Sequence, residues 1–206
     1  MLELSSEDQI RLEKLLEITA PFKALLYDVD GTLADNMSAH TAAYMEASRR
    51  HGVEMDPELI VETAGWPTVK VAKEISVRYN KEFDPQTFAN IKSKIFIEEF
   101  VHQTLPIKFV YSHLINNKDQ KRIALVSGGR RSTLQHTLKA IGVEGNYEFL
   151  VCADDTEKGK PHPDPFLKAA QLLGVAPEDC IVLEDGDPGV QGAIKAGMGW
   201  VRIDQL

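Results

Sequence analysis

The sequence predicts an α/β fold, namely a Rossmann-like, doubly wound parallel sheet with an inserted α-helical cap. Five short apolar runs have the composition of buried strands, and helical patterns separate the last four of them. Strands that alternate with helices are typical of a parallel sheet with helices on both faces. The segment 36–106, between the first two runs, contains helical patterns and no convincing strand. We therefore expect an N-terminal helix (1–20), a core (21–35 plus 107–206) and a helical cap (36–106).

The elements of the core follow from local signals. Ser5-Ser6-Glu7-Asp8 is typical of a helix start, and apolar residues follow at helical spacing until Pro21. The predicted strands are 24–27, 123–126, 149–151, 181–183 and 200–203. The predicted core helices are 133–141, 166–173 and 190–196. Each of these helices is followed directly by a glycine that favours a C-terminal cap: Gly142, Gly174 and Gly197.

The cap contains further helix signals. Residues 37–50 form a helical pattern that ends near Gly52, and a further helix is predicted over 67–79. Asp56-Pro57 and Asp84-Pro85 each combine an N-cap residue with a proline in the first helical turn. The apolar stripe that follows Pro85 predicts a helix reaching about Phe100.

Composition limits the classes of partner and the compartment. The chain has 206 residues and a net charge of −8 without a basic block, which argues against binding to nucleic acid or to an anionic membrane. No apolar run approaches the roughly 20 residues that span a bilayer, and the N-terminus lacks the pattern of a signal peptide. Cys152 and Cys180 are expected to be buried thiols of a reducing compartment. We expect a cytoplasmic protein that is a monomer or weak dimer and binds a small phosphorylated molecule.

Chemically active residues follow four of the predicted strands. In an open parallel sheet, the residues beyond the carboxyl ends of the strands bind ligands. Here these positions hold two acids after the first strand, a hydroxyl and two glycines after the second, a cation after the third and two acids after the fourth. These residues are Asp28, Asp30, Ser127, Gly128, Gly129, Lys160, Glu184 and Asp185.

This combination of residue types suits phosphoryl transfer. A carboxylate at Asp28 can attack phosphorus if cations offset the repulsion between the two anions. Asp28, Asp185 and a backbone carbonyl are oxygen ligands suited to magnesium, and Lys160 is expected to hold both Asp28 and the phosphate. Ser127 and the amides of the two following glycines can bind phosphate oxygens. Asp30, if protonated, can donate a proton to the leaving oxygen and then activate water.

The same residue types also occur in other kinds of site. An Asx-turn or a calcium loop is an alternative for Asp28 and Asp30, but an EF-hand is excluded because Ala39 stands where its last glutamate is required. A hydrolytic dehalogenase needs neither a proton donor at Asp30 nor magnesium. A non-catalytic binding module is expected to lack one of Asp28, Asp30, Lys160 or Asp185, and all four are present.

Taken in order, these motifs resemble those of the haloacid dehalogenase superfamily. The carrying residues are Asp28-Val29-Asp30-Gly31-Thr32, Ser127, Gly159-Lys160-Pro161 and Glu184-Asp185-Gly186-Asp187. The sequence is most similar to the branch of β-phosphoglucomutases and small sugar-phosphate phosphatases, including fructose-1-phosphate phosphatases. The resemblance covers nearly all of the chain after residue 21.

The resemblance implies a role for each matched residue. Asp28 would form an aspartyl-phosphate and Asp30 would be the general acid/base. Magnesium would be bound by Asp28, the Asp30 carbonyl, Asp185 and, through water, Glu184. The residues that match substrate-side positions of the cap are His40, Lys94 and Thr68, the last in the loop Gly65-Trp66-Pro67-Thr68. His40 and Lys94 are equally typical of an ordinary solvated helix face, so that alternative stays open.

The resemblance predicts a magnesium-dependent phosphatase acting on a small phosphomonoester, with a sugar phosphate as the expected substrate. The alternative is a mutase of the β-phosphoglucomutase type, which shares every core residue. The mutases carry an arginine near Thr68 and a threonine where this chain has Asn36, and both departures favour the phosphatase.

Overall fold

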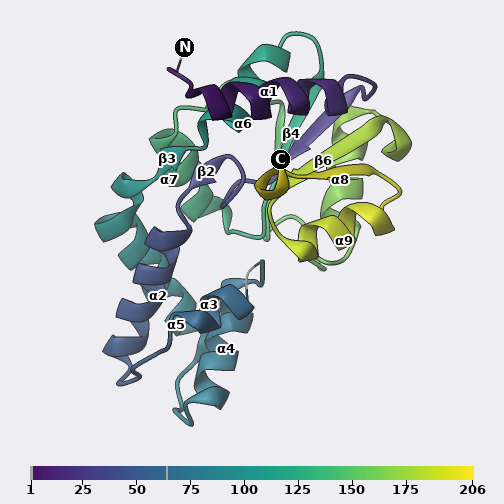
Figure 1. Cartoon of the computed structure of the whole chain (residues 1–206). Helices are drawn as coiled ribbons and strands as arrows, with labels where there is room; N and C mark the ends of the chain where they lie inside the picture. Colours follow the sequence, from purple (N-terminus) through teal and green to yellow (C-terminus); the bar gives the residue numbers. More distant parts are fainter. Residues whose placement is uncertain (1, 64) are drawn as a thin grey trace.

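The core of the molecule is a five-stranded parallel sheet in the order β5-β4-β1-β6-β7 (Figure 1). The computed structural model describes residues 2–63 and 65–206. The strands are β1 Ala24–Tyr27, β4 Arg122–Val126, β5 Phe149–Val151, β6 Cys180–Glu184 and β7 Gly199–Arg202. β1 lies between β4 and β6 and pairs in parallel with both. The predicted fold class is confirmed.

Helices cover both faces of the sheet because alternate side chains of each strand point to opposite sides. Leu25 and Tyr27 of β1 pack in one apolar cluster, and Ala24 and Leu26 pack in another. The first cluster is covered by α1 Ser6–Thr19, α6 Lys108–Asn117 and α7 Arg131–Ala140. The second is covered by α8 Asp164–Leu173 and α9 Asp187–Lys195. Two short 3-10 turns, η3 Pro177–Asp179 and η4 Ile203–Gln205, complete the core.

The remaining helices form a separate lobe, which we call the helical insert (Figure 1). It lies between β2 Ala34–Asp35 and β3 Leu105–Pro106, two short strands that pair antiparallel where the chain leaves and re-enters the core. The insert consists of α2 Met37–Arg50, α3 Glu58–Glu62, α4 Thr68–Arg78, α5 Pro85–Ile95, the π-helical turn η1 Phe96–Phe100 and the 3-10 turn η2 Val101–Gln103. It has an apolar cluster of its own.

The sequence predicts no element at 34–35, 105–106 or 108–117, where the structure has β2, β3 and α6. A strand of two residues is too short to show alternation, so only the pairing of distant segments defines β2 and β3. α6 carries a helical spacing of buried residues, Phe109, Val110, His113 and Leu114, which was a usable signal.

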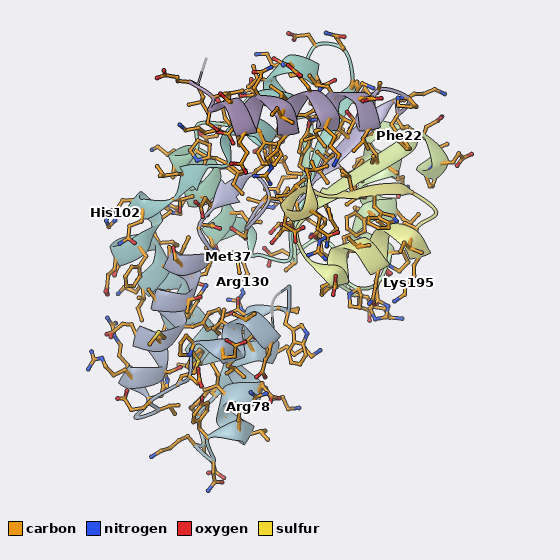
Figure 2. All side chains as sticks on the ribbon, in the orientation of Figure 1. Phe22, Met37, Arg78, His102, Arg130 and Lys195 are labelled. Carbon is orange, nitrogen blue, oxygen red and sulfur yellow. The ribbon has the colours of Figure 1, made fainter. Side chains whose placement is uncertain are left out.

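The insert contacts the core at its inner end. The Arg130 guanidinium, at the start of α7, donates a hydrogen bond of 2.7 Å to the Asn90 side chain on α5. A Cβ atom at Gly65 would lie 3.3 Å from Pro188 on α9, so this loop of the insert approaches the core closely. Figure 2 shows Met37 and Arg130 at the border between the two parts, and Arg78 at the far end of the insert. None of the helices within the described ranges combines the length and apolarity needed to cross a membrane.

A buried polar network joins α1 and α6 to the central strand. His113 lies 2.8 Å from the Thr19 hydroxyl through Nε2 and 2.8 Å from the Tyr27 hydroxyl through Nδ1. Burial, aided by the positive charge of Lys121, lowers the pKa of His113 to about 3. The imidazole is therefore neutral in the folded protein and must stay neutral to keep this packing.

We expect His113 to make folding stability pH-dependent. Because its pKa is lower in the folded state, the unfolded state binds more protons between pH 3 and about pH 6.5. The free energy of unfolding should therefore fall as the pH drops below about 6.5, by up to about 1.4 kcal/mol per pH unit from this group. Urea denaturation at pH 7 and pH 5 measures this free energy of unfolding.

His113→Gln should lose less free energy of unfolding between the two pH values than the wild type does. The substitution of an exposed histidine, His136→Gln, should behave as wild type. Equal losses in wild type and His113→Gln would contradict the assignment.

Candidate active site

One lysine joins the ends of two neighbouring strands at the carboxyl edge of the sheet. Asp28 follows β1 directly, and Glu184 is the last residue of β6. The Lys160 ammonium, in the loop after β5, lies 2.5 Å from Asp28 Oδ1 and 2.5 Å from Glu184 Oε1. All three side chains are buried. This geometry brings together residues that are up to 156 positions apart, as the strand-end pattern predicts.

Three carboxylates at this edge lie close enough together to bind one divalent cation. Oxygen atoms of Asp28, Glu184 and Asp185 lie within 4.8 Å of one another. Burial raises the pKa of Asp28 well above its usual value, although Lys160 acts in the opposite direction. Burial and the neighbouring Glu184 raise the pKa of Asp185 to about 6. Buried carboxylates that repel one another are stabilised by a hard cation, so these residues fit such a metal.

The turn after β1 is built around this acidic cluster. Gly31 has φ 90°, a left-handed conformation that favours glycine, and its amide donates to the Ala34 carbonyl at 2.8 Å. The Thr32 hydroxyl donates to Asp185 Oδ1 at 2.8 Å. A Cβ atom at Gly31 would overlap the Asp185 carboxylate. Gly31 and Thr32 therefore position Asp185, a role that the sequence pattern did not reveal.

The residues that follow β4 are Ser127, Gly128 and Gly129. They line the cavity between the core and the insert. The Ser127 side chain is buried, and its hydroxyl oxygen accepts a hydrogen bond of 3.0 Å from the Gly129 amide. Gly128 lies near the insert, since a Cβ atom there would be 3.6 Å from the Gly65 carbonyl oxygen. This loop therefore lines the cavity between Asp28 and the insert, with the Gly129 amide bound to Ser127.

Asp30 belongs to a hydrogen-bonded chain that extends into the insert. Asp30 Oδ1 accepts from the Asn36 amide at 2.6 Å and lies 3.2 Å from His40 Nε2. The Lys92 ammonium, on α5, lies 2.7 Å from His40 Nδ1. Burial and the Lys92 charge lower the pKa of His40, so the imidazole is neutral, with Nδ1 accepting from Lys92 and Nε2 donating to Asp30.

These contacts set the charge of Asp30. Burial opposes its ionisation, but His40, the Asn36 hydrogen bond and the Lys92 charge outweigh burial and hold its pKa at about 2. Asp30 is thus a carboxylate, the form that accepts a proton. Burial lowers the pKa of Lys92 to about 7, with Asp30 acting in the opposite direction.

The cavity between core and insert has a volume of about 140 Å³. This is below the volume of pockets for drug-sized ligands. The core lines the cavity with Asp28, Asp30, Lys160, Glu184, Asp185 and the loop at Ser127. The insert lines it with His40, Thr68 and Lys92. Lys94, which the family resemblance placed near substrate, lies outside the cavity. Its side chain is 72% exposed and is 3.9 Å from Glu98.

The sequence analysis missed three residues of the site. Lys92 and Tyr44 line the cavity, and Asn36 donates a hydrogen bond to Asp30. A signal for Lys92 was available. It lies four residues after Phe88 and three before Ile95, on the buried stripe of α5, whereas Lys94 does not. Tyr44 follows Met37 and His40 at helical spacing on α2, and all three line the cavity.

We expect Gly31→Ala to weaken binding of a divalent cation by about 10- to 100-fold, because the new methyl group displaces the Asp185 carboxylate. Isothermal titration with Mg²⁺ measures this. Gly142→Ala is the matched control, since Gly142 also has a positive φ of 67° but has no atom within 4 Å of the added Cβ. If both variants bind Mg²⁺ as the wild type does, Asp185 does not belong to a cation site.

Comparisons with known proteins agree with this geometry. A family model described as haloacid dehalogenase-like hydrolase matches residues 25–203. The chain is 30% identical over 186 residues to the fructose-1-phosphate phosphatase YqaB of Escherichia coli, covering 90% of this chain and 98% of that protein. It is 31% identical over 183 residues to hexitol phosphatase A of the same organism, covering 88% of this chain and 83% of that protein.

Solved structures support the fold. The structure of a β-phosphoglucomutase from Clostridium difficile superimposes with a TM-score of 0.76 at 24% sequence identity. The match covers 88% of this chain and 84% of that one. The family model spans the strand-end motifs that hold Asp28, Ser127, Lys160 and Asp185. The predicted family is confirmed, and the chain belongs to the haloacid dehalogenase-like hydrolases.

Proposed function

We propose that this protein is a magnesium-dependent phosphatase that hydrolyses a small phosphomonoester, a sugar phosphate, through an aspartyl-phosphate on Asp28. The observation that carries the proposal is the buried Asp28 carboxylate, which is bound by Lys160 and lines one cavity together with the Asp30–His40–Lys92 chain. Two relatives of about 30% identity, which match over most of their length, are named as sugar-phosphate and hexitol phosphatases.

The core end of the cavity would bind the phosphoryl group. Lys160, the Ser127 hydroxyl and the Gly128 amide would provide donors for its oxygens, whereas the Gly129 amide already donates to Ser127 Oγ. Asp28, Asp185 and the Asp30 carbonyl would hold Mg²⁺, with Glu184 acting through water. When bound, magnesium neutralises negative charge on the phosphoryl oxygens and on the nucleophile.

The reaction would take place in two steps at Asp28 and Asp30. Lys160 engages Oδ1 of Asp28, which leaves Oδ2 to form the new bond to phosphorus as the ester P–O bond breaks. The leaving oxygen takes a proton from Asp30, which must first be protonated. In the second step Asp30 accepts a proton from water as the water oxygen attacks phosphorus, and Asp28 and inorganic phosphate are released. The low pKa of Asp30 leaves it ionised and able to accept that proton.

A mutase fits the cavity less well. A mutase must hold a second phosphate on the cap side while the intermediate turns over, which a guanidinium does well. Thr68 offers one neutral hydroxyl instead. Among the described insert residues that line the cavity, the single lysine or arginine is Lys92, and it is bound to His40.

The wider setting is part of the same proposal. We place the protein in the cytoplasm, as a monomer or weak dimer that binds neither nucleic acid nor membrane. The net charge of −8 supports this, because it repels polyanions. The cysteines Cys152 and Cys180 are both free and buried, which suits a reducing compartment.

We expect the wild type to release inorganic phosphate from hexose phosphates, and excess chelator to abolish the release. Asp28→Asn should lower kcat by roughly 10³-fold or more, and its circular dichroism should stay that of a folded protein because Lys160 keeps its ion pair with Glu184. Phosphorus NMR with β-glucose 1-phosphate and a trace of the bisphosphate distinguishes the two enzyme classes. Rapid formation of glucose 6-phosphate with negligible free phosphate would favour the mutase instead.

Lys92 and Lys94 provide a matched pair of substitutions on one helix. Lys92→Met should lower kcat by roughly 10- to 100-fold, because it removes the charge-assisted hydrogen bond that holds His40 against Asp30. Lys94→Met removes an exposed charge and should leave kcat within twofold of the wild type. Steady-state hydrolysis of p-nitrophenyl phosphate measures both. If Lys94→Met proves the more damaging variant, the cavity lysine has been misassigned.

A further inference from the structure

The His40 imidazole is contacted at both of its nitrogen atoms and on one of its faces. Nε2 lies 3.2 Å from Asp30 Oδ1, and the Lys92 ammonium lies 2.7 Å from Nδ1. The Phe96 ring is stacked on the imidazole, with the ring centroids 4.1 Å apart and an angle of 4° between the two planes. The two hydrogen bonds belong to the chain described above, whereas the stacked ring has so far no part in the proposed chemistry.

Phe96 does not contact the space that a ligand would occupy. Its side chain is fully buried in the apolar cluster of the insert, and it is not among the described residues that line the cavity. His40 does line the cavity. Phe96 can therefore influence a ligand only through the cavity residues that it touches, and the parallel stacking makes His40 the first of these.

The backbone of the insert places Phe96 and Lys92 against the same imidazole. The two residues are four positions apart, so their side chains lie one helical turn apart on the same face. Phe96 also begins the π-helical turn η1, in which its carbonyl accepts from the Val101 amide. This turn packs against α2, the helix that carries His40. π-helical turns are rare, and they are frequent at functional sites.

The stacked ring restricts a motion that the hydrogen bonds control poorly. A histidine ring turns about its Cβ–Cγ bond, and this torsion has broad energy minima. Turning carries both nitrogen atoms out of the plane in which Asp30 and Lys92 meet them. Lys92 has a flexible four-carbon side chain that can follow the nitrogen it binds. A parallel aromatic ring opposes the turn, because the two faces lose contact as the angle between them grows.

We propose that Phe96 is a positioning residue of this active site, whose ring holds the His40 imidazole in the plane from which Nε2 donates to Asp30. This rests on the proposed phosphatase function, in which Asp30 gives a proton to the leaving oxygen and accepts one from water. Phe96 exchanges no proton itself. It acts through His40, and its loss should weaken the hydrogen bond that orients Asp30.

The first test compares two buried phenylalanines of the same helical stretch by steady-state hydrolysis of p-nitrophenyl phosphate. Phe96→Leu keeps an apolar side chain without a flat ring. It should lower kcat about tenfold and leave KM within twofold, because a hydrogen bond in the site weakens and no ligand contact is lost. Phe88→Leu is the matched control. Phe88 is also fully buried and lies beside a histidine, His51, at 5.1 Å between ring centroids, but neither residue lines the cavity.

Phe88→Leu should therefore keep kcat within twofold of the wild type. An equal fall of kcat in both variants, or a wild-type kcat in Phe96→Leu, would overturn the proposal. Phe96→Met also lacks a flat ring, and it takes the place of Phe96→Leu if circular dichroism shows that the leucine variant does not fold.

The second test asks whether Phe96 acts through His40. In the background of His40→Ala the imidazole is gone, so Phe96→Leu should change kcat by less than twofold. A purely structural role of Phe96 in the insert predicts instead the same tenfold loss in both backgrounds. That result would show that Phe96 acts by a route other than His40 and would overturn the proposal.

A measurement on the resting protein separates this proposal from the phosphatase function. Protons that lie over the face of an aromatic ring resonate upfield in proton NMR, so the His40 ring protons should move downfield in Phe96→Leu and stay in place in Phe88→Leu. Unmoved His40 protons in Phe96→Leu would overturn the stacking. If the protons move but the wild type does not hydrolyse p-nitrophenyl phosphate, the phosphatase proposal is wrong. If the wild type hydrolyses it and Phe96→Leu does so equally well, the phosphatase stands and the positioning role does not.

Discussion

The ion pairs of Lys160 with Asp28 and Glu184 are the interaction on which the site depends. Three carboxylates are gathered where β1 and β6 end, and burial raises the pKa of two of them, Asp28 and Asp185. One buried ammonium offsets part of their negative charge, and removing a partner from such a buried pair typically costs about 3–5 kcal/mol. The site therefore depends on the parallel pairing of β1 with β6, which brings Asp28 and Glu184 within reach of one lysine.

Lys160 offsets only part of the negative charge of the three carboxylates. The local backbone and its neighbouring side chains hold the other carboxylate oxygens in place. Asp185 is fixed by Thr32 and by close packing over Gly31, and Glu184 accepts hydrogen bonds from the amides of Asp185 and Gly186. Asp185 and one oxygen of Glu184 are thus held by neutral donors, which leave the negative charge available to a cation. Such orientation by neighbouring groups is what makes a set of acids a defined site.

The insert completes the cavity with a different chemistry. The core end presents acids, one lysine and backbone amides, which suit a metal and a phosphoryl group. The insert end presents apolar side chains, two hydroxyls and the Lys92–His40 pair, whose charge is directed at Asp30. The insert contacts the core through the Arg130–Asn90 hydrogen bond and through the close approach of Gly65 to Pro188. The position of the insert therefore determines whether Asp30 and the cavity wall face the same ligand.

By itself the sequence determined the parallel sheet, most helices and the acids, hydroxyl and lysine at the strand ends. These follow from local periodicity, from caps such as Gly174 with φ 67°, and from the rule that strand ends share one edge. It did not determine β2 and β3, which exist through the pairing of residues 34–35 with 105–106. It also did not separate Lys92 from Lys94 or reveal that Tyr44 lines the cavity. These depend on which helix faces meet in the insert, and only tertiary packing decides that.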